Sequence, residues 1–309
     1  MWLALAFCGP VLWAASTHID KYLVDRFFHE SDVGVLLVFT ALINLVPLPL
    51  IWWFDPSVTS IGPQGIAVMV TSGVLYMGAM YFYLGALQGE EASVVAPLFQ
   101  AGPLFTYALA FFVLGERLSG LQLIGGGAII CGAVIISLNP RQLKRGFRLR
   151  LVLLMLACTA SLALASVVFK LFAVRDEFWT TTFWMFIGEA VFGLAFLVFP
   201  APRAEFFGMF RKNPYAVGGI NAANELINLG GGLAARYASI LGPVSLVQAI
   251  GGTTTFFVFA FGVLLSLVYP RLGREDLSAQ SLIQKALAAV FIALGVALIG
   301  DQQGVFGPN

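Results

Sequence analysis

Residues 91–103 read EASVVAPLFQAGP, and residues 237–251 read YASILGPVSLVQAIG. Both stretches open with Ala-Ser, reach a Pro a few residues later and then a Gln-Ala pair. A motif that returns in the same order within one chain is the usual trace of an internal repeat. The fold therefore depends on whether the rest of the chain is duplicated as well.

Other landmarks recur in the same order. Lys21 and Lys170 each follow an Ala-Ser pair near the end of an apolar run, and ERLSGLQLI at 116–124 matches EDLSAQSLI at 275–283 in register. Each match alone could be chance, because small residues and Leu recur in any apolar protein. Together they predict two homologous halves and a basic connector, at residues 1–140, 149–309 and 141–148 respectively.

The composition is that of a membrane protein. Only 11% of the 309 residues are charged and 59% are hydrophobic, whereas soluble domains carry roughly 25% charge. The net charge of +1 argues against a nucleic-acid partner. The three cysteines lie in apolar runs and there are two histidines, so we expect neither a disulfide framework nor a metal site, and no cofactor.

Ten apolar runs are long enough to span a bilayer as helices, which predicts an all-α integral membrane protein. Two halves with five spans each must enter the membrane in opposite directions. This is the inverted-repeat architecture of secondary transporters, whose sites lie near the membrane midplane. The runs are residues 2–22, 33–54, 64–88, 92–114, 119–138, 150–171, 180–200, 215–237, 240–269 and 281–300.

Residues 92–138 resemble the EamA-type members of the drug/metabolite transporter superfamily. The stretch ASVVAPLFQAGPLFTYALAFFVLGERLSGLQLIGGGAIICGAVIISL is similar to the family's fourth helix, its terminal Gly-Glu and its fifth helix. The resemblance implies two five-helix repeats. The second half departs from the pattern, because it lacks a Pro where Pro103 stands and has a longer link before Glu275.

The repeat and the resemblance together favour a secondary active transporter of a small metabolite, working by alternating access. Relatives handle amino acids and their derivatives, quaternary ammonium compounds and nucleotide sugars. An exporter of amino-acid-like, cationic or zwitterionic solutes, with protons as candidate coupling ions, is the leading expectation. A lipid-linked or nucleotide-sugar translocator of the same fold is the alternative, and a polytopic membrane enzyme is a remote one. The sequence implies no particular oligomeric state.

The distribution of basic residues predicts the orientation. Arg141, Lys144, Arg145, Arg148 and Arg150 crowd the loop between the halves, whereas the opposite side carries few basic residues, with Arg236 among them. Because positive charge marks cytoplasmic loops, we expect this loop to be cytoplasmic and both termini extracytoplasmic. The expected location is the bacterial inner membrane.

The run at 215–237 is the least lipid-like of the ten. Asn221, Glu225 and Asn228 fall on one helical face, with Asn224 beside it. A carboxylate at bilayer depth is costly unless it faces water, a partner or a proton, so this face is expected to line a substrate cavity. The alternative is a hydrogen-bonded seam between helices.

Glu189 stands alone among apolar residues in the run at 180–200. One interpretation is a coupling group that takes up and releases a proton as the cavity closes and opens. The other is a structural acid that stays protonated or pairs with Lys170. The sequence leaves both open.

Further candidates for the cavity come from the repeat and from the aromatic residues. Gln100 and Gln248 are the paired amides of the two halves, and each precedes a helix-weakening Pro or Gly pair. Tyr76, Tyr81 and Trp184 could offer aromatic faces to a cation or ring. Small residues in the runs at 119–138 and 281–300, among them Ala289, Ala293 and Ala297, predict close helix packing.

Overall fold

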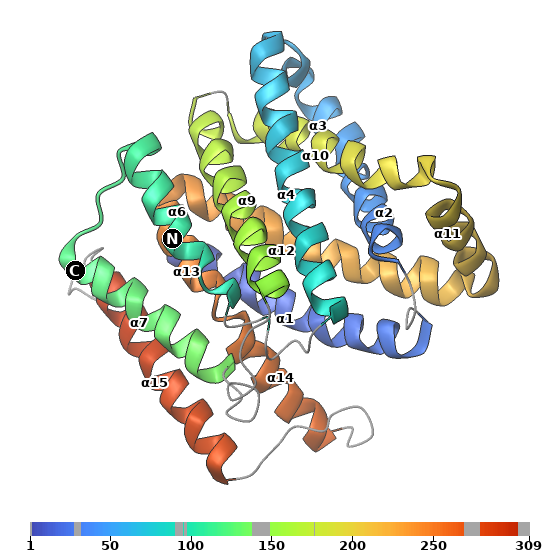
Figure 1. Ribbon diagram of the computed structural model, residues 1–309. Helices are drawn as coiled ribbons and strands as arrows, with labels where there is room; N and C mark the ends of the chain where they lie inside the picture. Colours follow the sequence, from blue (N-terminus) through green and yellow to red (C-terminus); the bar gives the residue numbers. More distant parts are fainter. Residues whose placement is uncertain are drawn as a thin grey trace.

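The computed structural model describes residues 2–27, 32–89, 95, 98–137, 149–175, 177–268 and 279–301. Within these ranges the chain forms helices and short turns, with no β-strand (Figure 1). The proposed connector at 141–148 lies outside them. The longer helices are α1 (Trp2–Phe27), α2 (Val33–Asn44), α3 (Pro47–Phe54), α4 (Pro63–Gly89), α6 (Gly102–Leu109), α7 (Gly120–Ser137), α9 (Leu149–Ala173), α10 (Phe178–Ala195), α11 (Pro200–Lys212), α12 (Asn221–Leu241), α13 (Val244–Gly251), α14 (Thr254–Val268) and α15 (Ala279–Asp301).

Seven segments of the described chain are long and apolar enough to cross a membrane, which confirms the all-α membrane architecture. Two shorter apolar helices, Gly102–Leu114 and Ile283–Ile299, fall where further spans are expected, and α12 is more polar. The total of ten spans remains a prediction. The seven are Trp2–Asp20, Val33–Phe54, Pro63–Ala86, Gly120–Ser137, Leu149–Arg175, Phe178–Val198 and Val244–Leu265.

Proline residues divide one of these spans. The segment Val33–Phe54 consists of α2 and α3, and α3 begins at Pro47. Proline has no backbone N–H and is favoured in the first turn of a helix, so a new helix starts there. The N-terminus of α2 is capped by Asp32, whose carboxylate accepts a 2.7 Å bond from the Gly34 amide. The division places Asn44 at the last turn of α2, inside the bundle.

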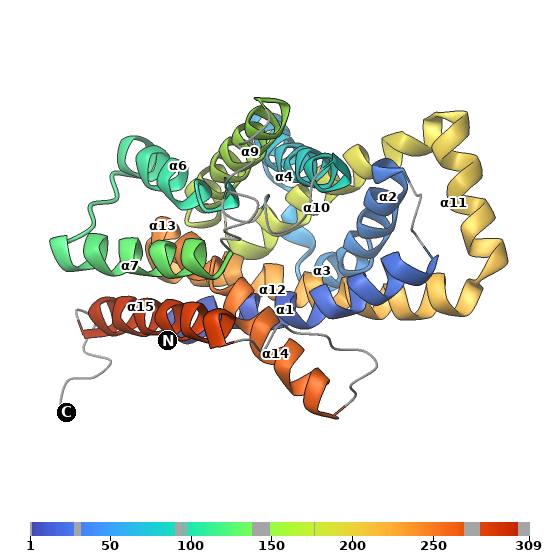
Figure 2. The same cartoon turned by 60° about the horizontal axis from the view of Figure 1, so that its bottom comes forward.

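The helices pack in pairs that are distant in sequence. The main contacts are α1 with α12, α4 with α9, and α7 with α15, while α10 crosses both α4 and α2. Helices α7 and α15 run side by side in both views (Figures 1 and 2). Helix α11 lies at one margin of the described structure, beside α2.

Glycines allow the closest crossings. A Cβ atom on Gly73 of α4 would collide with the backbone oxygen of Met185 in α10, and one on Gly188 of α10 would collide with that of Val70 in α4. The two backbones therefore touch one residue away from Glu189. Small residues permit this approach between membrane helices.

The predicted small-residue seam between the fifth and tenth spans is present, but with different residues on one side. On α7, Gly125 and Gly132 face α15, as expected. On α15 the facing residue is Gly295, whereas Ala293 and Ala297 are exposed. Ala289, Ala293 and Ala297 recur every four residues, but the face in contact with α7 is set by how the two helices cross.

Candidate functional site

Glu189 of α10 is 1% exposed and is not solitary. It forms an ion pair with Arg236 of α12, and its other carboxylate oxygen accepts a 2.5 Å hydrogen bond from the side-chain amide of Asn44 in α2. The pairing with Lys170 considered from the sequence is wrong. Arg236, expected at an extracytoplasmic span end, instead extends its side chain into the bundle.

Aromatic rings surround the Arg236 guanidinium. Its central carbon lies 5.0 Å from the ring centroid of Phe186, 5.3 Å from that of Tyr76 and 5.9 Å from that of Phe169. An arginine over aromatic faces gains cation–π attraction, which rises as the group is desolvated. Tyr76 therefore lies at this ion pair.

The predicted polar face of α12 points toward α1 and α2. Asn221 and Asn224 are buried. The Asn224 side-chain amide donates a 2.5 Å hydrogen bond to Asp20 of α1, and the hydroxyl of Thr40 in α2 donates a 3.2 Å bond to Glu225. Asn228 is half-buried on the same helix.

Helix α2 connects the two groups of contacts. Thr40 and Asn44 are four residues apart on one helical face, and they bond Glu225 and Glu189 respectively. Polar side chains of α1, α2, α4, α10 and α12 therefore meet in several contacts inside the bundle. We call this set the polar stripe: Asp20, Thr40, Asn44, Tyr76, Glu189, Asn221, Asn224, Glu225 and Arg236.

The paired glutamines lie in a different layer, where α13 meets α6 and α9. The Gln248 amide donates a 2.6 Å bond to the hydroxyl of Ser166. Gln100 is buried with its amide oxygen against Gly252, where any larger residue would clash. Both side chains thus contact partners at the junction of the proposed halves.

Tyr81 and Trp184 do not join the polar stripe. Tyr81 is exposed and stacks on Phe196 with ring centroids 5.6 Å apart. It lies five positions after Tyr76, which turns it to another face of α4. The Trp184 indole donates a 2.7 Å bond to the backbone oxygen of Val58 and packs on a separate apolar cluster.

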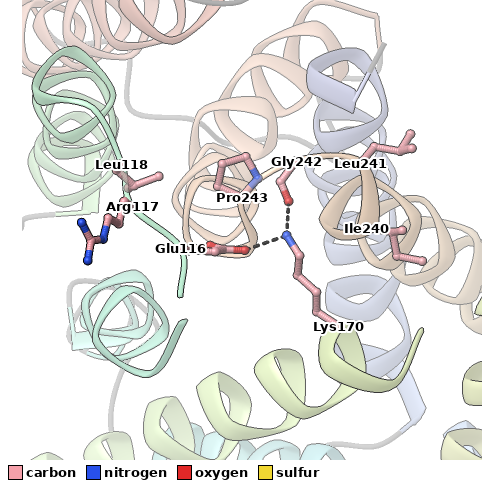
Figure 3. A pocket seen from close by; sticks show the side chains of 8 residues that line it. All are labelled: Glu116, Arg117, Leu118, Lys170, Ile240, Leu241, Gly242 and Pro243. Atoms are coloured by element: carbon pink, nitrogen blue, oxygen red, sulfur yellow. Dashed lines mark hydrogen bonds and ion pairs between the residues drawn. The ribbon is translucent and has the colours of Figure 1, made fainter. Parts of the chain in front are cut away.

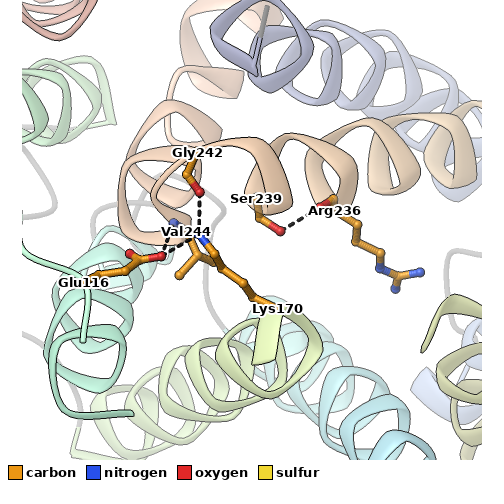
Figure 4. Close-up of polar contacts among 6 residues, drawn as sticks. All are labelled: Glu116, Lys170, Arg236, Ser239, Gly242 and Val244. Carbon is orange, nitrogen blue, oxygen red and sulfur yellow. Dashed lines mark hydrogen bonds and ion pairs between the residues drawn. The ribbon is translucent and has the colours of Figure 1, made fainter. Parts of the chain in front are cut away.

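A third set of polar contacts is centred on Lys170 of α9. The Lys170 ammonium donates 2.6 Å bonds to Glu116 and to the backbone oxygen of Gly242 (Figure 3). The same Glu116 oxygen accepts a 3.2 Å bond from the Val244 amide at the start of α13. Glu116, Lys170 and Gly242 border a depression of about 280 Å³. In Figure 4 the Arg236 guanidinium is directed away from Lys170, so the two ion pairs are separate.

Sequence reasoning missed several residues of the site. The sequence alone does not single out Asp20, and it shows Arg236 only as one of the few basic residues of its side. Asn44 carried one available signal, an isolated amide within an apolar run. Among the described residues, no group of three or more His, Cys, Asp or Glu could hold a metal ion.

Comparison with known proteins agrees with this architecture. The EamA-like transporter family matches residues 1–138. The chain is 33% identical over 141 residues to the uncharacterized transporter YwfM of Bacillus subtilis, covering 45% of this chain and 46% of that protein. It is 32% identical over 139 residues to an uncharacterized protein of Methanocaldococcus jannaschii, covering 44% of this chain and 96% of that protein.

A further relative is an uncharacterized transporter of Archaeoglobus fulgidus, 26% identical over 134 residues, which are 42% of this chain and 45% of that protein. The match thus spans less than half the length of this relative and of YwfM. A crystal structure of another protein has the same fold over 99% of both chains, with a TM-score of 0.68 and 17% identity.

The apolar helices identify an integral membrane protein, and two of the matched relatives are named as transporters. The chain belongs to the EamA-like transporter family, within the drug/metabolite transporter superfamily.

Proposed function

We propose that this protein is a secondary active transporter that exports a small amino-acid-like, cationic or zwitterionic metabolite by alternating access. The observation that carries the proposal is the polar stripe, because ionisable groups inside a membrane bundle are costly and usually mark a solute or ion path. Asp20, Glu189 and Glu225 are acidic, and Arg236 is the basic member of the stripe. This excess of carboxylates suits a cationic or zwitterionic solute better than a nucleotide sugar, whose phosphates need basic partners.

The two-repeat organisation, at residues 1–140 and 149–309, is part of the proposal. If each span is matched with the one five spans later, the contact of α1 with α12 corresponds to that of α9 with α4. The pairs α7 with α15, α2 with α10, and α6 with α13 then each join a span to its own counterpart. The Methanocaldococcus jannaschii relative, matched over 96% of its length by 139 residues, has the size of one such half.

Alternating access requires contacts that close one end of the bundle and then break. The bonds of Lys170 to Glu116 and Gly242 join the first proposed half to the second. The repeat landmarks match Lys170 with Lys21 and Glu116 with Glu275, whose side chains lie outside the described residues. We assign the Lys170 contact to the extracytoplasmic end, opposite the basic connector.

Proton coupling is assigned to Glu189. Proton uptake would neutralise its carboxylate and release Arg236, so protonation and the arrangement of α10, α12 and α2 would be linked. In this scheme the substrate cavity is bordered by the α12 residues Asn221, Asn224, Glu225 and Asn228, with Tyr76 at the ion pair and Gln100 and Gln248 at the junction of the halves.

The function is tested in two steps. A thermal-shift screen of the purified protein against amino acids, amines and nucleotide sugars identifies solutes that bind, because a ligand stabilises the state that it binds. Counterflow in liposomes is then measured with the stabilising solute. We expect saturable counterflow of an unchanged solute. A chemically altered product would identify an enzyme instead.

The orientation gives a separate prediction. A cysteine at Gln142, in a chain without the native cysteines, is expected to resist an impermeant thiol reagent in intact bacterial cells, because the basic connector is cytoplasmic. The measurement compares labelling before and after the membrane is permeabilised. Full labelling in intact cells would reverse the orientation.

A further inference from the structure

The Asp20 carboxylate of α1 is contacted by polar side chains from two helices. It accepts a 2.5 Å bond from the side-chain amide of Asn224 in α12 and a 3.4 Å bond from the hydroxyl of Ser16, one turn earlier in α1. Both partners are neutral. The negative charge of Asp20 is therefore hydrogen-bonded by these groups but not balanced by them.

Asn224 supplies an independent observation. The residue is 0% exposed, and its side-chain oxygen has no hydrogen-bond partner among the described residues. A buried polar atom without a partner destabilises the folded protein, so a water or an ion is its expected partner. This oxygen belongs to the same side-chain amide whose nitrogen bonds Asp20.

We propose that Asp20, Ser16 and Asn224 form a binding site for a monovalent cation, either Na⁺ or K⁺ or the ammonium group of a small solute. The groups present a carboxylate, a hydroxyl and an amide oxygen, which are the hard ligands that such cations prefer. One positive charge would balance the Asp20 carboxylate, and a charge at membrane depth is less costly when it is paired.

The position of the site permits entry of a cation. Asp20 is exposed, whereas Ser16 and Asn224 beside it are buried. Asp20 precedes the end of α1 at Phe27 by a helical rise of about 10 Å. Glu225 follows Asn224 directly, bonded to Thr40, and its carboxyl adds a further oxygen-rich group next to the site.

This site is distinct from the Glu189–Arg236 pair assigned to proton coupling. The cation site rests on the proposed function only for its biological role, because cation binding is measured at equilibrium, without transport. Failure to bind a cation would leave the transporter proposal standing. Failure of counterflow would leave the binding site standing.

The test is thermal unfolding of the purified full chain in detergent, at constant chloride and ionic strength. NaCl, KCl or methylammonium chloride replaces the bulky N-methylglucamine chloride stepwise. We expect a saturable rise in Tm with at least one of the three cations. Saturation by Na⁺ or K⁺ identifies an inorganic ion, and saturation by methylammonium identifies the ammonium group of a solute.

Variants locate the site. Asp20→Asn is expected to raise the half-saturating concentration at least about tenfold, because it removes the charged ligand. Ser16→Ala is expected to raise the half-saturating concentration less. This variant provides the test if Asp20→Asn does not fold. Thr17→Ala is the matched control, since this exposed hydroxyl bonds only the backbone oxygen of Trp13 in its own helix.

Three results would overturn the proposal. The first is the absence of a saturable shift with any of the monovalent cations, which would leave an ordinary water as the partner of Asn224. The second is a shift produced by divalent cations alone. The third is a shift that is the same in wild type, Asp20→Asn and Ser16→Ala, which would place the bound cation elsewhere.

Discussion

Replacing Glu189 by Gln is expected to destabilise the folded protein by about 3–5 kcal/mol, the usual effect of removing one partner of a buried ion pair. Arg236 would keep its charge in a largely buried position, with side-chain exposure of 13%. The new amide would direct donor hydrogens at Arg236 or at Asn44, which are themselves donors. The measurement is unfolding by denaturant in mixed micelles.

Two further variants distinguish the ion pair from a general sensitivity to polar change. Glu225→Gln should cost less than about 1.5 kcal/mol, because the partner of Glu225 is a rotatable hydroxyl and not a cation. The double variant Glu189→Gln/Arg236→Gln should lose less stability than the two single variants added together. Equal stability of Glu189→Gln and wild type would contradict the ion pair.

The same substitution tests coupling wherever the variant is folded. If Glu189 carries the proton, Glu189→Gln should abolish uphill accumulation of the solute and retain counterflow between equal pools. Both are measured on one preparation of the variant in liposomes. Retention of both would move the coupling assignment to Glu225.

Gly73→Ala is the second substitution with a large expected effect, about 3 kcal/mol of lost stability. The added methyl group meets the backbone oxygen of Met185 and the backbone nitrogen of Glu189, so α4 and α10 must separate. Adding a methyl group to a packed interior lowers stability, and the loss is near the upper end of its range when the methyl group meets backbone atoms. Because α10 carries Glu189, the ion pair with Arg236 should weaken too.

Gly85→Ala in the same helix is the matched control. A methyl group there meets no atom within 4 Å, and alanine favours a helix over glycine by about 0.8–1.0 kcal/mol. We expect Gly85→Ala to be neutral or slightly stabilising in the same unfolding assay. Equal effects of the two alanines would contradict the close crossing.

The sequence was sufficient for the class of fold because apolar length and low charge are local properties. It also identified the polar face of α12 and the isolated Glu189, since an amide or carboxylate within an apolar run is visible without a structure. The sequence could not pair Glu189 with Arg236. Side chains of opposite charge on different helices meet only where those helices cross, as α10 and α12 do here.

Other differences have the same origin. Asp20 and Lys21 adjoin in sequence, but the Asp20 carboxylate contacts Asn224 on another helix. Trp184 was expected in the cavity wall, yet the backbone oxygen of Val58 bonds its indole elsewhere. The sequence shows how aromatic residues are spaced along a helix. The partner of each aromatic ring, however, depends on how the helices cross.

The central claim is that the polar face of α12 borders a solute path that opens to one side at a time. Cysteine scanning from Ile220 to Leu229, in a chain without native cysteines, tests it directly. Aqueous thiol reagents applied from each side in turn should react at Asn221, Glu225 and Asn228 and spare the outward-facing Ala223 and Leu226. The bound solute should change the reactive side. Inert positions throughout, or labelling that is strongest at Ala223 and Leu226, would contradict the claim.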